Sequence, residues 1–298
     1  MNYTQSLFFT VEVERMMICR SRGWNDEVSE VNRIRIKIVA TFVPLLALTT
    51  SLILYANSLG LKNNHVSDLV LMVVSGAACF YAIMIVLRQK FDGVNGISYA
   101  VFASGLLLWF AAEFSWGYYE IVLGEDIPSM GIADMLWLVG YGPFIYYVLR
   151  LYRFYCSKQV EKRTMAIIGM LIGMLGIFMI NSLLNGLSMD EMDSATAVAV
   201  TYILLDLFLL TFILAILWTL WNGKLASVTF FFLTSSLLIG TVADMIYGYA
   251  IIHEKEPWVA DIFFSAQYIC IVGALFWHNR FFIFNKDRMI REWQKENK

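Results

Sequence analysis

Eight stretches of apolar residues follow one another along the chain and are separated by short polar connections. A helix needs about 20 apolar residues to cross the hydrocarbon core of a bilayer. Inside a membrane the backbone N–H and C=O groups must be paired within the structure, which makes each spanning segment a helix. The pattern therefore predicts eight membrane-spanning helices, at 38–60, 67–87, 98–122, 133–150, 164–186, 196–221, 227–252 and 259–280.

The overall composition agrees with this pattern. Of the 298 residues, 59% are hydrophobic and only 15% are charged, and the mean hydropathy is +0.64. A soluble domain of this size carries many more charged residues. The sequence therefore predicts an all-α, polytopic membrane protein whose main surroundings are the lipid bilayer.

The basic residues are sorted along the chain. Of 22 Lys and Arg residues, 20 lie in the N-terminal arm, in every second connection and in the C-terminal tail, whereas Lys62 and Lys255 lie in the other connections. Cytoplasmic segments are the ones enriched in Lys and Arg. This alternation predicts a protein of the cell membrane with both termini in the cytoplasm, and it supports the count of eight spans.

Two parts of the sequence resemble each other, which indicates an internal repeat. Glu113 and Asp244 occupy matching positions in the alignment, as do Asp134 and Asp261. Spans three and four thus have counterparts in spans seven and eight. Four spans are an even number, so the two units would enter the membrane in the same direction, related by an axis along the membrane normal. The aligned segments are AEFSWGYY (112–119) with ADMIYGYA (243–250), and ADMLWLVGY (133–141) with ADIFFSAQY (260–268).

The repeat also sets the predicted organisation of the chain. Each unit holds four spans, and the connection between the units is rich in basic residues. The predicted parts are a cytoplasmic arm at 1–37, a first four-helix repeat at 38–152, a cytoplasmic loop at 153–163, a second four-helix repeat at 164–280 and a basic tail at 281–298.

Acidic and aromatic residues share helix faces within the spans. An ionisable residue in a membrane span is costly, and it is usually turned toward protein or water and marks a functional site. No Lys or Arg lies in the core of any span to neutralise these acids. We therefore predict an outward-facing cavity that binds a small ligand or protons, formed by Glu113, Trp116, Asp134, Trp137, Tyr141, Asp206, Asp244, Tyr247, Asp261 and Tyr268.

Purely structural roles for the same residues stay open. Glu113 and Asp244 could each accept a hydrogen bond that fixes helix packing. Asp134 and Asp261 lie at the first turn of their helices, where aspartate caps free N–H groups and complements the helix dipole. The aromatic residues near the outer surface are also typical of an interfacial belt.

Several kinds of chemistry have no support in the sequence. The four cysteines and three histidines lack the spacing of a metal site, and two cysteines lie in apolar spans. No phosphate-binding loop, zinc-protease motif or nucleophile motif occurs. We therefore expect no enzyme activity, no metal, no cofactor and no binding of nucleic acid.

The hairpin formed by spans three and four resembles the multi-pass sensor modules of archaeal and bacterial signalling proteins. Those modules carry an E-x-x-W helix followed by P-S-x-A-D-x-x-W/Y-L-x-x-Y, and they often precede a histidine kinase or a diguanylate cyclase. This chain departs from the pattern at Met130-Gly131-Ile132 and carries no output domain. The resemblance implies a sensing module with a separate cytoplasmic signalling partner or membrane complex. The residues that follow the pattern are Glu113, Trp116, Pro128, Ser129, Ala133, Asp134, Trp137, Leu138 and Tyr141.

Two functions remain after these observations. The first is a non-enzymatic sensor or accessory membrane protein, and the second is an ion-coupled small-molecule transporter that uses Glu113, Asp206 and Asp244. Many transporters break helices with Gly or Pro in both halves. Here Pro44 and Pro143 lie inside spans of the first half, whereas no proline lies inside a span of the second half. This asymmetry favours the sensor or accessory role.

Overall fold

The computed structural model describes residues 24–59, 65–91, 93–124, 131–156, 162–185, 187, 193–221, 226–253, 255 and 257–280. This part of the chain forms helices and no strands. Eight of the helices are long and apolar enough to cross a membrane. The prediction of an all-α, polytopic membrane protein is therefore confirmed.

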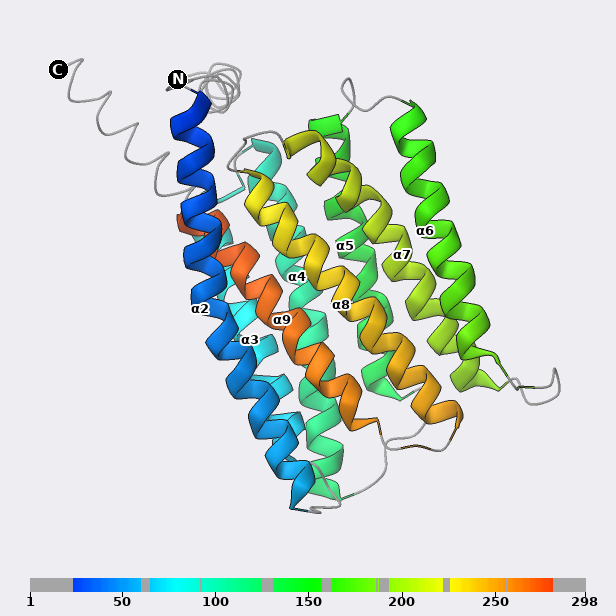
Figure 1. Cartoon of the computed structure of the whole chain (residues 1–298). Helices are drawn as coiled ribbons and strands as arrows, with labels where there is room; N and C mark the ends of the chain where they lie inside the picture. Colours follow the sequence, from blue (N-terminus) through cyan, green and yellow to red (C-terminus); the bar gives the residue numbers. More distant parts are fainter. Residues whose placement is uncertain are drawn as a thin grey trace.

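The helices follow the predicted spans in order (Figure 1). The third span ends in a π-helical segment, η1, which closes at Gly124 in the left-handed conformation that glycine adopts without strain. The helices are α2 (Trp24–Ser58), α3 (His65–Gln89), α4 (Gly93–Gly117), η1 (Tyr118–Leu123), α5 (Ile132–Cys156), α6 (Lys162–Leu183), α7 (Ser194–Leu220), α8 (Ala226–Ile252) and α9 (Trp258–His278).

Several helices extend beyond the predicted spans, most clearly α2 and α5. α2 begins at Trp24, well inside the segment predicted as an arm. α5 continues to Cys156 instead of ending at Arg150. Leu151 and Cys156 are buried, so packing against neighbouring helices continues α5 past the point at which the hydropathy falls. Hydropathy reports the lipid-spanning part of a helix and not its full length.

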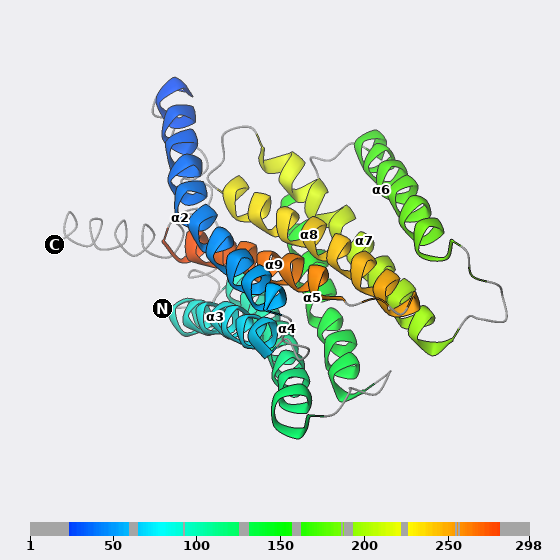
Figure 2. The same cartoon turned by 60° about the horizontal axis from the view of Figure 1, so that its bottom comes forward.

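The helix contacts follow the same order in both halves of the chain. In the first half α4 packs against α3 and α5, and in the second half α8 packs against α7 and α9. The halves meet where α2 and α3 pack against α9 and where α5 packs against α7. α2 and α6 lie at opposite edges (Figures 1 and 2). The α3–α9 and α5–α7 contacts correspond under a two-fold relation between the halves, whereas the α2–α9 contact has no counterpart of similar extent between α6 and α5 in the described residues. The repeat stays a prediction.

One packing detail recurs in both halves with the residue sizes exchanged. In the first half Trp109 of α4 lies flat against Gly140 of α5, where a Cβ atom would collide with the indole. In the second half Gly240 of α8 faces Gln267 of α9, and a Cβ atom on this glycine would collide with the Gln267 amide. These four residues occupy matching positions in the register of the alignment given above. Each helix pair thus packs closely by placing a large side chain over a glycine.

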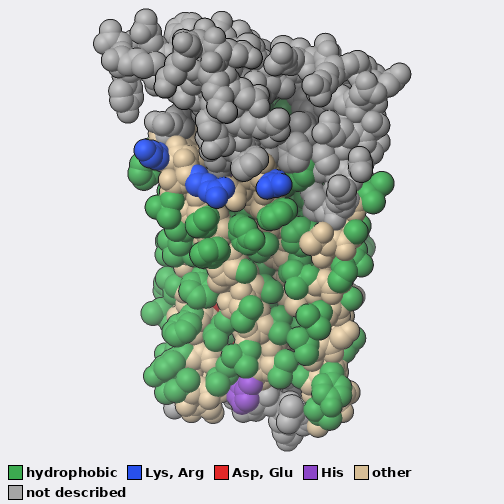
Figure 3. Space-filling model, turned by 90° about the vertical axis from the view of Figure 1, so that its left-hand side faces the viewer, with side chains coloured by type: hydrophobic (Ala, Val, Ile, Leu, Met, Phe, Trp, Pro, Cys, Tyr) green, Lys and Arg blue, Asp and Glu red, His purple; other side chains and the backbone are tan. Residues whose placement is uncertain are grey.

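The surface of the bundle divides into a broad apolar band and two ends (Figure 3). Large apolar side chains such as Val73 and Ile177 are more than two-thirds exposed, as lipid-facing residues are. We call the end of the bundle that carries Arg88, Arg153 and Arg280 the basic end. The opposite end, which carries Glu120, Asp134 and Asp261, is called the acidic end.

Candidate functional site

Two short hydrogen bonds between tyrosines and carboxyl groups lie inside the bundle. The Tyr268 hydroxyl of α9 donates to Oε1 of Glu113 on α4, at 2.7 Å. The Tyr141 hydroxyl of α5 donates to Oδ1 of Asp206 on α7, also at 2.7 Å. All four side chains are buried. Each bond joins one half of the chain to the other, so these two contacts tie the halves together.

Trp109 holds both tyrosines in place. Its ring lies 5.4 Å from that of Tyr141 and 6.2 Å from that of Tyr268, edge to face in both cases. Its indole nitrogen donates to the backbone oxygen of Trp137 at 3.1 Å, which fixes the ring across the α4–α5 contact. A buried indole N–H normally finds such a partner. Gly140, which faces the Trp109 indole, therefore contributes to the site because it leaves room for this ring between the two tyrosines.

Asp244 of α8 extends the cluster. Its carboxyl group lies near that of Asp206. Oδ2 of Asp206 is buried and has no hydrogen-bond partner within the described residues. Two neighbouring carboxyl groups repel each other when both are charged, so a proton or a cation between them is favourable. Glu113, Asp206 and Asp244 thus form the centre of the candidate site.

A layer of partly exposed aromatic rings covers this centre on the side of the acidic end. Trp116 lies 5.6 Å from Trp137 and 6.1 Å from Tyr247, measured between ring centroids. The Trp137 side chain also lies near the Glu113 carboxyl group and the Tyr268 hydroxyl. The structure therefore brings the three predicted aromatic residues together, directly next to the buried carboxyl groups.

Asp134 has a structural role at the start of α5. Its Oδ2 accepts the backbone N–H of Gly131 at 3.2 Å, and its Oδ1 accepts the Tyr202 hydroxyl at 3.3 Å. A carboxyl group three residues into a helix that reaches back to the preceding N–H is half of a capping box. Asp134 therefore caps the start of α5, as the structural alternative predicted. Its contact with the Tyr202 hydroxyl also links it to α7.

Asp261 behaves differently from its predicted counterpart. α9 is preceded by Pro257, and no side chain caps its first turn. The Asp261 carboxyl group instead lies beside Ser67 of α3 and near Glu120 of η1. Asp68 of α3, which is also buried, faces the same group. Asp261 thus belongs to a second acidic group at the contact of α3 with α9, apart from the Asp206–Asp244 pair.

The sequence reasoning missed four residues that shape these groups: Ser67, Asp68, Trp109 as a support for both tyrosines, and Tyr202. A signal for Tyr202 was present, because it precedes Asp206 by one helical turn and so shares its face. Asp68 was visible as an acid at the start of a span. The position of Ser67 against Asp261 depends on which helices meet, and no local pattern contains that information.

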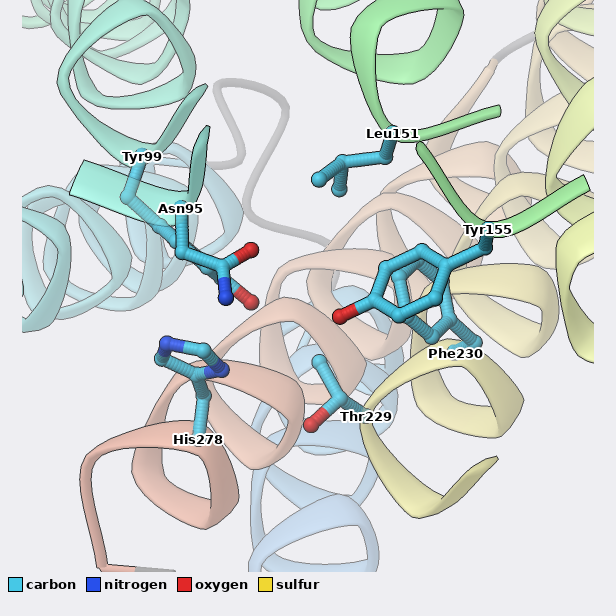
Figure 4. Close-up of a pocket in the computed structure, with 7 residues that line it drawn as sticks. All are labelled: Asn95, Tyr99, Leu151, Tyr155, Thr229, Phe230 and His278. Atoms are coloured by element: carbon cyan, nitrogen blue, oxygen red, sulfur yellow. The ribbon is translucent and has the colours of Figure 1, made fainter. Parts of the chain in front are cut away.

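The described residues limit the chemistry of the site. They contain no group of three or more His, Cys, Asp or Glu side chains arranged to hold a metal ion. One pocket lined by described residues lies at the basic end, between α4, α5, α8 and α9 (Figure 4). The arrangement near the acidic end can hold, accept and release protons, and it presents aromatic faces and carboxyl groups to a cation.

No family model, curated protein or solved structure matches this chain. The resemblance to sensor modules therefore depends on the sequence motif of spans three and four. The functional interpretation below is based on that motif and on the geometry of the carboxyl groups.

Proposed function

We propose that this chain is a sensing module of the cell membrane, with both termini in the cytoplasm and without enzyme activity. In this proposal the carboxyl groups near the acidic end bind protons or a small cationic ligand from outside. The change is passed to a cytoplasmic signalling partner or to a membrane complex. The observation that carries the proposal is the pair of 2.7 Å bonds that join Tyr268 to Glu113 and Tyr141 to Asp206 across the two halves.

These bonds offer a route from binding to a change in shape. A charged carboxylate accepts a shorter and stronger hydrogen bond than a neutral carboxyl group does. Uptake of a proton or a cation at Glu113 or Asp206 therefore changes the strength of a bond that holds the halves together. A ligand shifts a conformational equilibrium only through such a difference in interaction between two states. The resulting change would be in how firmly α9 is held to α4 and α7 to α5.

The aromatic layer supports a cationic ligand. The faces of Trp and Tyr rings attract ammonium groups, more strongly where water is excluded. Trp116, Trp137 and Tyr247 are partly exposed, and the carboxyl groups of Asp134 and Asp261 lie near Tyr247. A neutral or anionic ligand would have no such complement at this place.

Packing in the middle of the bundle favours sensing over transport. The ring of Phe144 lies 4.8 Å from Trp109 and 5.2 Å from Phe102, and Phe102 lies 4.6 Å from Tyr147. These buried rings pack along the α4–α5 contact between Glu113 and the basic end. A coupled transporter needs access to its site from both sides of the membrane.

Carboxyl infrared difference spectroscopy in reconstituted membranes tests the proposal. We expect a carboxyl band that changes between about pH 5 and pH 8, the range available to a physiological pH sensor. The band should be lost in Glu113→Gln or Asp244→Asn, and it should shift in Tyr268→Phe because the Glu113 acceptor loses its donor. Addition of tetramethylammonium chloride should perturb the same band.

The control is Asp193→Asn, which removes an exposed carboxyl group at the start of α7 and should leave the band unchanged. If Glu113 and Asp244 keep one protonation state over the whole range, do not respond to the ammonium ion, and their variants only unfold more easily, the cluster is a packing device. The sensing proposal would then be wrong.

A further inference from the structure

The second acidic group, at the acidic end, contains a pair of carboxyl groups from α3 and η1. Asp68 in the first turn of α3 lies near Glu120 of η1, and Asp261 of α9 lies near both. Asp68 is only 6% exposed, whereas Glu120 and Asp261 are partly exposed. One member of the Asp68–Glu120 pair is therefore buried in the bundle, and the other borders the surface.

A glycine and a π-helical turn bring the pair together. Gly117 is the last residue of α4, and a Cβ atom on it would lie 2.8 Å from Sδ of Met72 and 3.7 Å from Cβ of Asp68. The first turns of α3 thus approach the end of α4 closely because this residue has no side chain. The backbone then continues as η1, and Glu120 follows Gly117 by three residues. π-helical turns are rare and are frequently found at functional sites.

The buried oxygen of the pair lacks a donor. Oδ2 of Asp68 is buried and has no hydrogen-bond partner within the described residues. A buried acceptor without a donor lowers stability, and the cost is larger when the acceptor is charged. Lys255, a basic residue at this end, lies instead over the Tyr249 ring, 4.9 Å from its centroid. Two neighbouring carboxylates also repel each other, so a proton on the pair removes both costs.

The other titratable groups near the pair add to this repulsion or are neutral. Asp261 of α9 and Glu113 of α4 lie near Asp68, and Tyr247 of α8 lies near Glu120. On α3 itself, His65 lies three residues before Asp68 and shares its face. Nδ1 of His65 is buried and makes no hydrogen bond in the described part of the chain.

The space at the pair selects a proton over a larger cation. Oδ2 of Asp68 is closed off from solvent, which leaves no room beside it for an ammonium group. The side chains of the described residues also include no group of three or more His, Cys, Asp or Glu arranged for a metal ion. A proton needs no cavity.

We propose that Asp68 and Glu120 bind one proton between them and that this proton holds η1 against the start of α3. When the O–H bond breaks, the proton passes to water at the acidic end and leaves a carboxylate on each residue. The repulsion between the two carboxylates then moves η1 away from α3. This contact is separate from the Tyr268–Glu113 and Tyr141–Asp206 bonds, so the proposal does not depend on the proposed sensing function.

Carboxyl infrared spectroscopy of the full-length protein in reconstituted membranes tests the bound proton. At neutral pH we expect a protonated carboxyl band that is lost in Asp68→Asn and shifted in Glu120→Gln, because the partner of the proton changes. The double variant should resemble Asp68→Asn. Equal bands in the wild-type protein and Asp68→Asn overturn the proposal. A band that keeps its position in Glu120→Gln overturns the sharing of the proton.

Hydrogen exchange of the η1 backbone amides tests the contact with α3. After correction for the intrinsic pH dependence of exchange, we expect the protection of η1 in the wild-type protein to fall about tenfold between about pH 6 and about pH 9. Protection should stay constant in Asp68→Asn and in Glu120→Gln, since neither amide can become charged. An equal fall in the wild-type protein and Asp68→Asn, or no fall in the wild-type protein, overturns the proposal.

Two variants serve as controls for the exchange experiment. His65→Gln removes the histidine on the same face of α3, and Asp193→Asn removes a distant, exposed carboxyl group. Both variants should keep the full fall in protection. A fall that is lost in His65→Gln would assign the pH response to the histidine and overturn the proposal.

Discussion

The buried carboxyl groups depend on single hydroxyl groups from distant parts of the chain. Glu113 is 7% exposed and Asp206 is fully buried, so water cannot replace a lost partner at either residue. A hydrogen bond contributes about 0.5–1.5 kcal/mol to stability, and somewhat more when one partner is charged. The two tyrosine hydroxyls therefore matter both for stability and for the state of the carboxyl groups.

Tyr268→Phe should lower the free energy of unfolding by about 1–3 kcal/mol, because Glu113 stays buried without its donor. Reversible unfolding in mixed detergents measures this change. Tyr118→Phe is the control, since Tyr118 is 46% exposed and its hydroxyl can reach water; its effect should stay within about 0.5 kcal/mol. Equal effects of both substitutions would contradict a specific role for the Tyr268 hydroxyl.

At the scale of residues, the sequence predicts which side chains are candidates but not which of them meet. Asp206 and Tyr141 were both predicted as site residues, yet their bond joins α5 to α7, and no periodicity within either helix contains that pairing. Asp134 and Asp261 occupy matching positions, but one caps its helix and the other faces Ser67. Their roles follow from the neighbouring helix, which differs between the halves.

At the scale of helices, two glycines of α5 have opposite surroundings, and only one of them lies in a close helix contact. Gly140 of α5 faces Trp109, whereas Gly142 has no atom near the position of a Cβ. Gly140→Ala should lower the free energy of unfolding by about 1–3 kcal/mol, because the extra methyl group overpacks the contact. The same unfolding assay should show Gly142→Ala to be neutral or up to about 1 kcal/mol more stable, since alanine favours a helix. A similar loss in both variants would contradict the packing argument.

The start of α7 is set by an aspartate. Oδ1 of Asp193 accepts the backbone N–H of Thr196 at 2.9 Å and its hydroxyl at 2.8 Å. The hydrogen bond from the backbone N–H, followed by that from the hydroxyl, lowers the pKa of Asp193 below its ordinary value. Asp193→Ala should reduce the free energy of unfolding by about 1 kcal/mol at neutral pH, because the cap is lost.

The pH dependence of this cap has a defined sign. A carboxyl group with a lowered pKa in the folded state stabilises the fold above its unfolded pKa of about 3.9, and the contribution is lost as the pH falls through the folded value. The difference in stability between the wild-type protein and Asp193→Asn should therefore be constant above about pH 5 and shrink below about pH 4. A difference that does not change with pH would show that the charge of Asp193 contributes nothing.

Helix positions were largely predictable from the sequence, because hydropathy is a property of each segment alone. The ends of α2 and α5 were not, since both helices continue beyond the apolar segment. In α5 the buried Leu151 and Cys156 stabilise the last turns by packing against neighbouring helices. A hydropathy profile contains no information on such packing.

At the scale of the whole molecule, the two ends of the bundle differ in charge. Arg88, Arg153 and Arg280 lie at the basic end, while Lys255 lies at the acidic end. The predicted orientation places the basic end in the cytoplasm. In a variant without the native cysteines, Lys255→Cys should react with an impermeant maleimide on intact cells, and Arg153→Cys should react only after the membrane is opened. The reverse order of labelling would contradict the orientation.

The exchange of large and small residues between the halves restricts how the chain can change over time. Replacing Gly140 by a larger residue meets Trp109, and replacing Trp109 by glycine first leaves a hole between the tyrosines. The same holds for Gly240 and Gln267 in the other half. Moving from one arrangement to the other by single substitutions thus passes through a less stable protein. Selection for stability would therefore keep each half in its own arrangement.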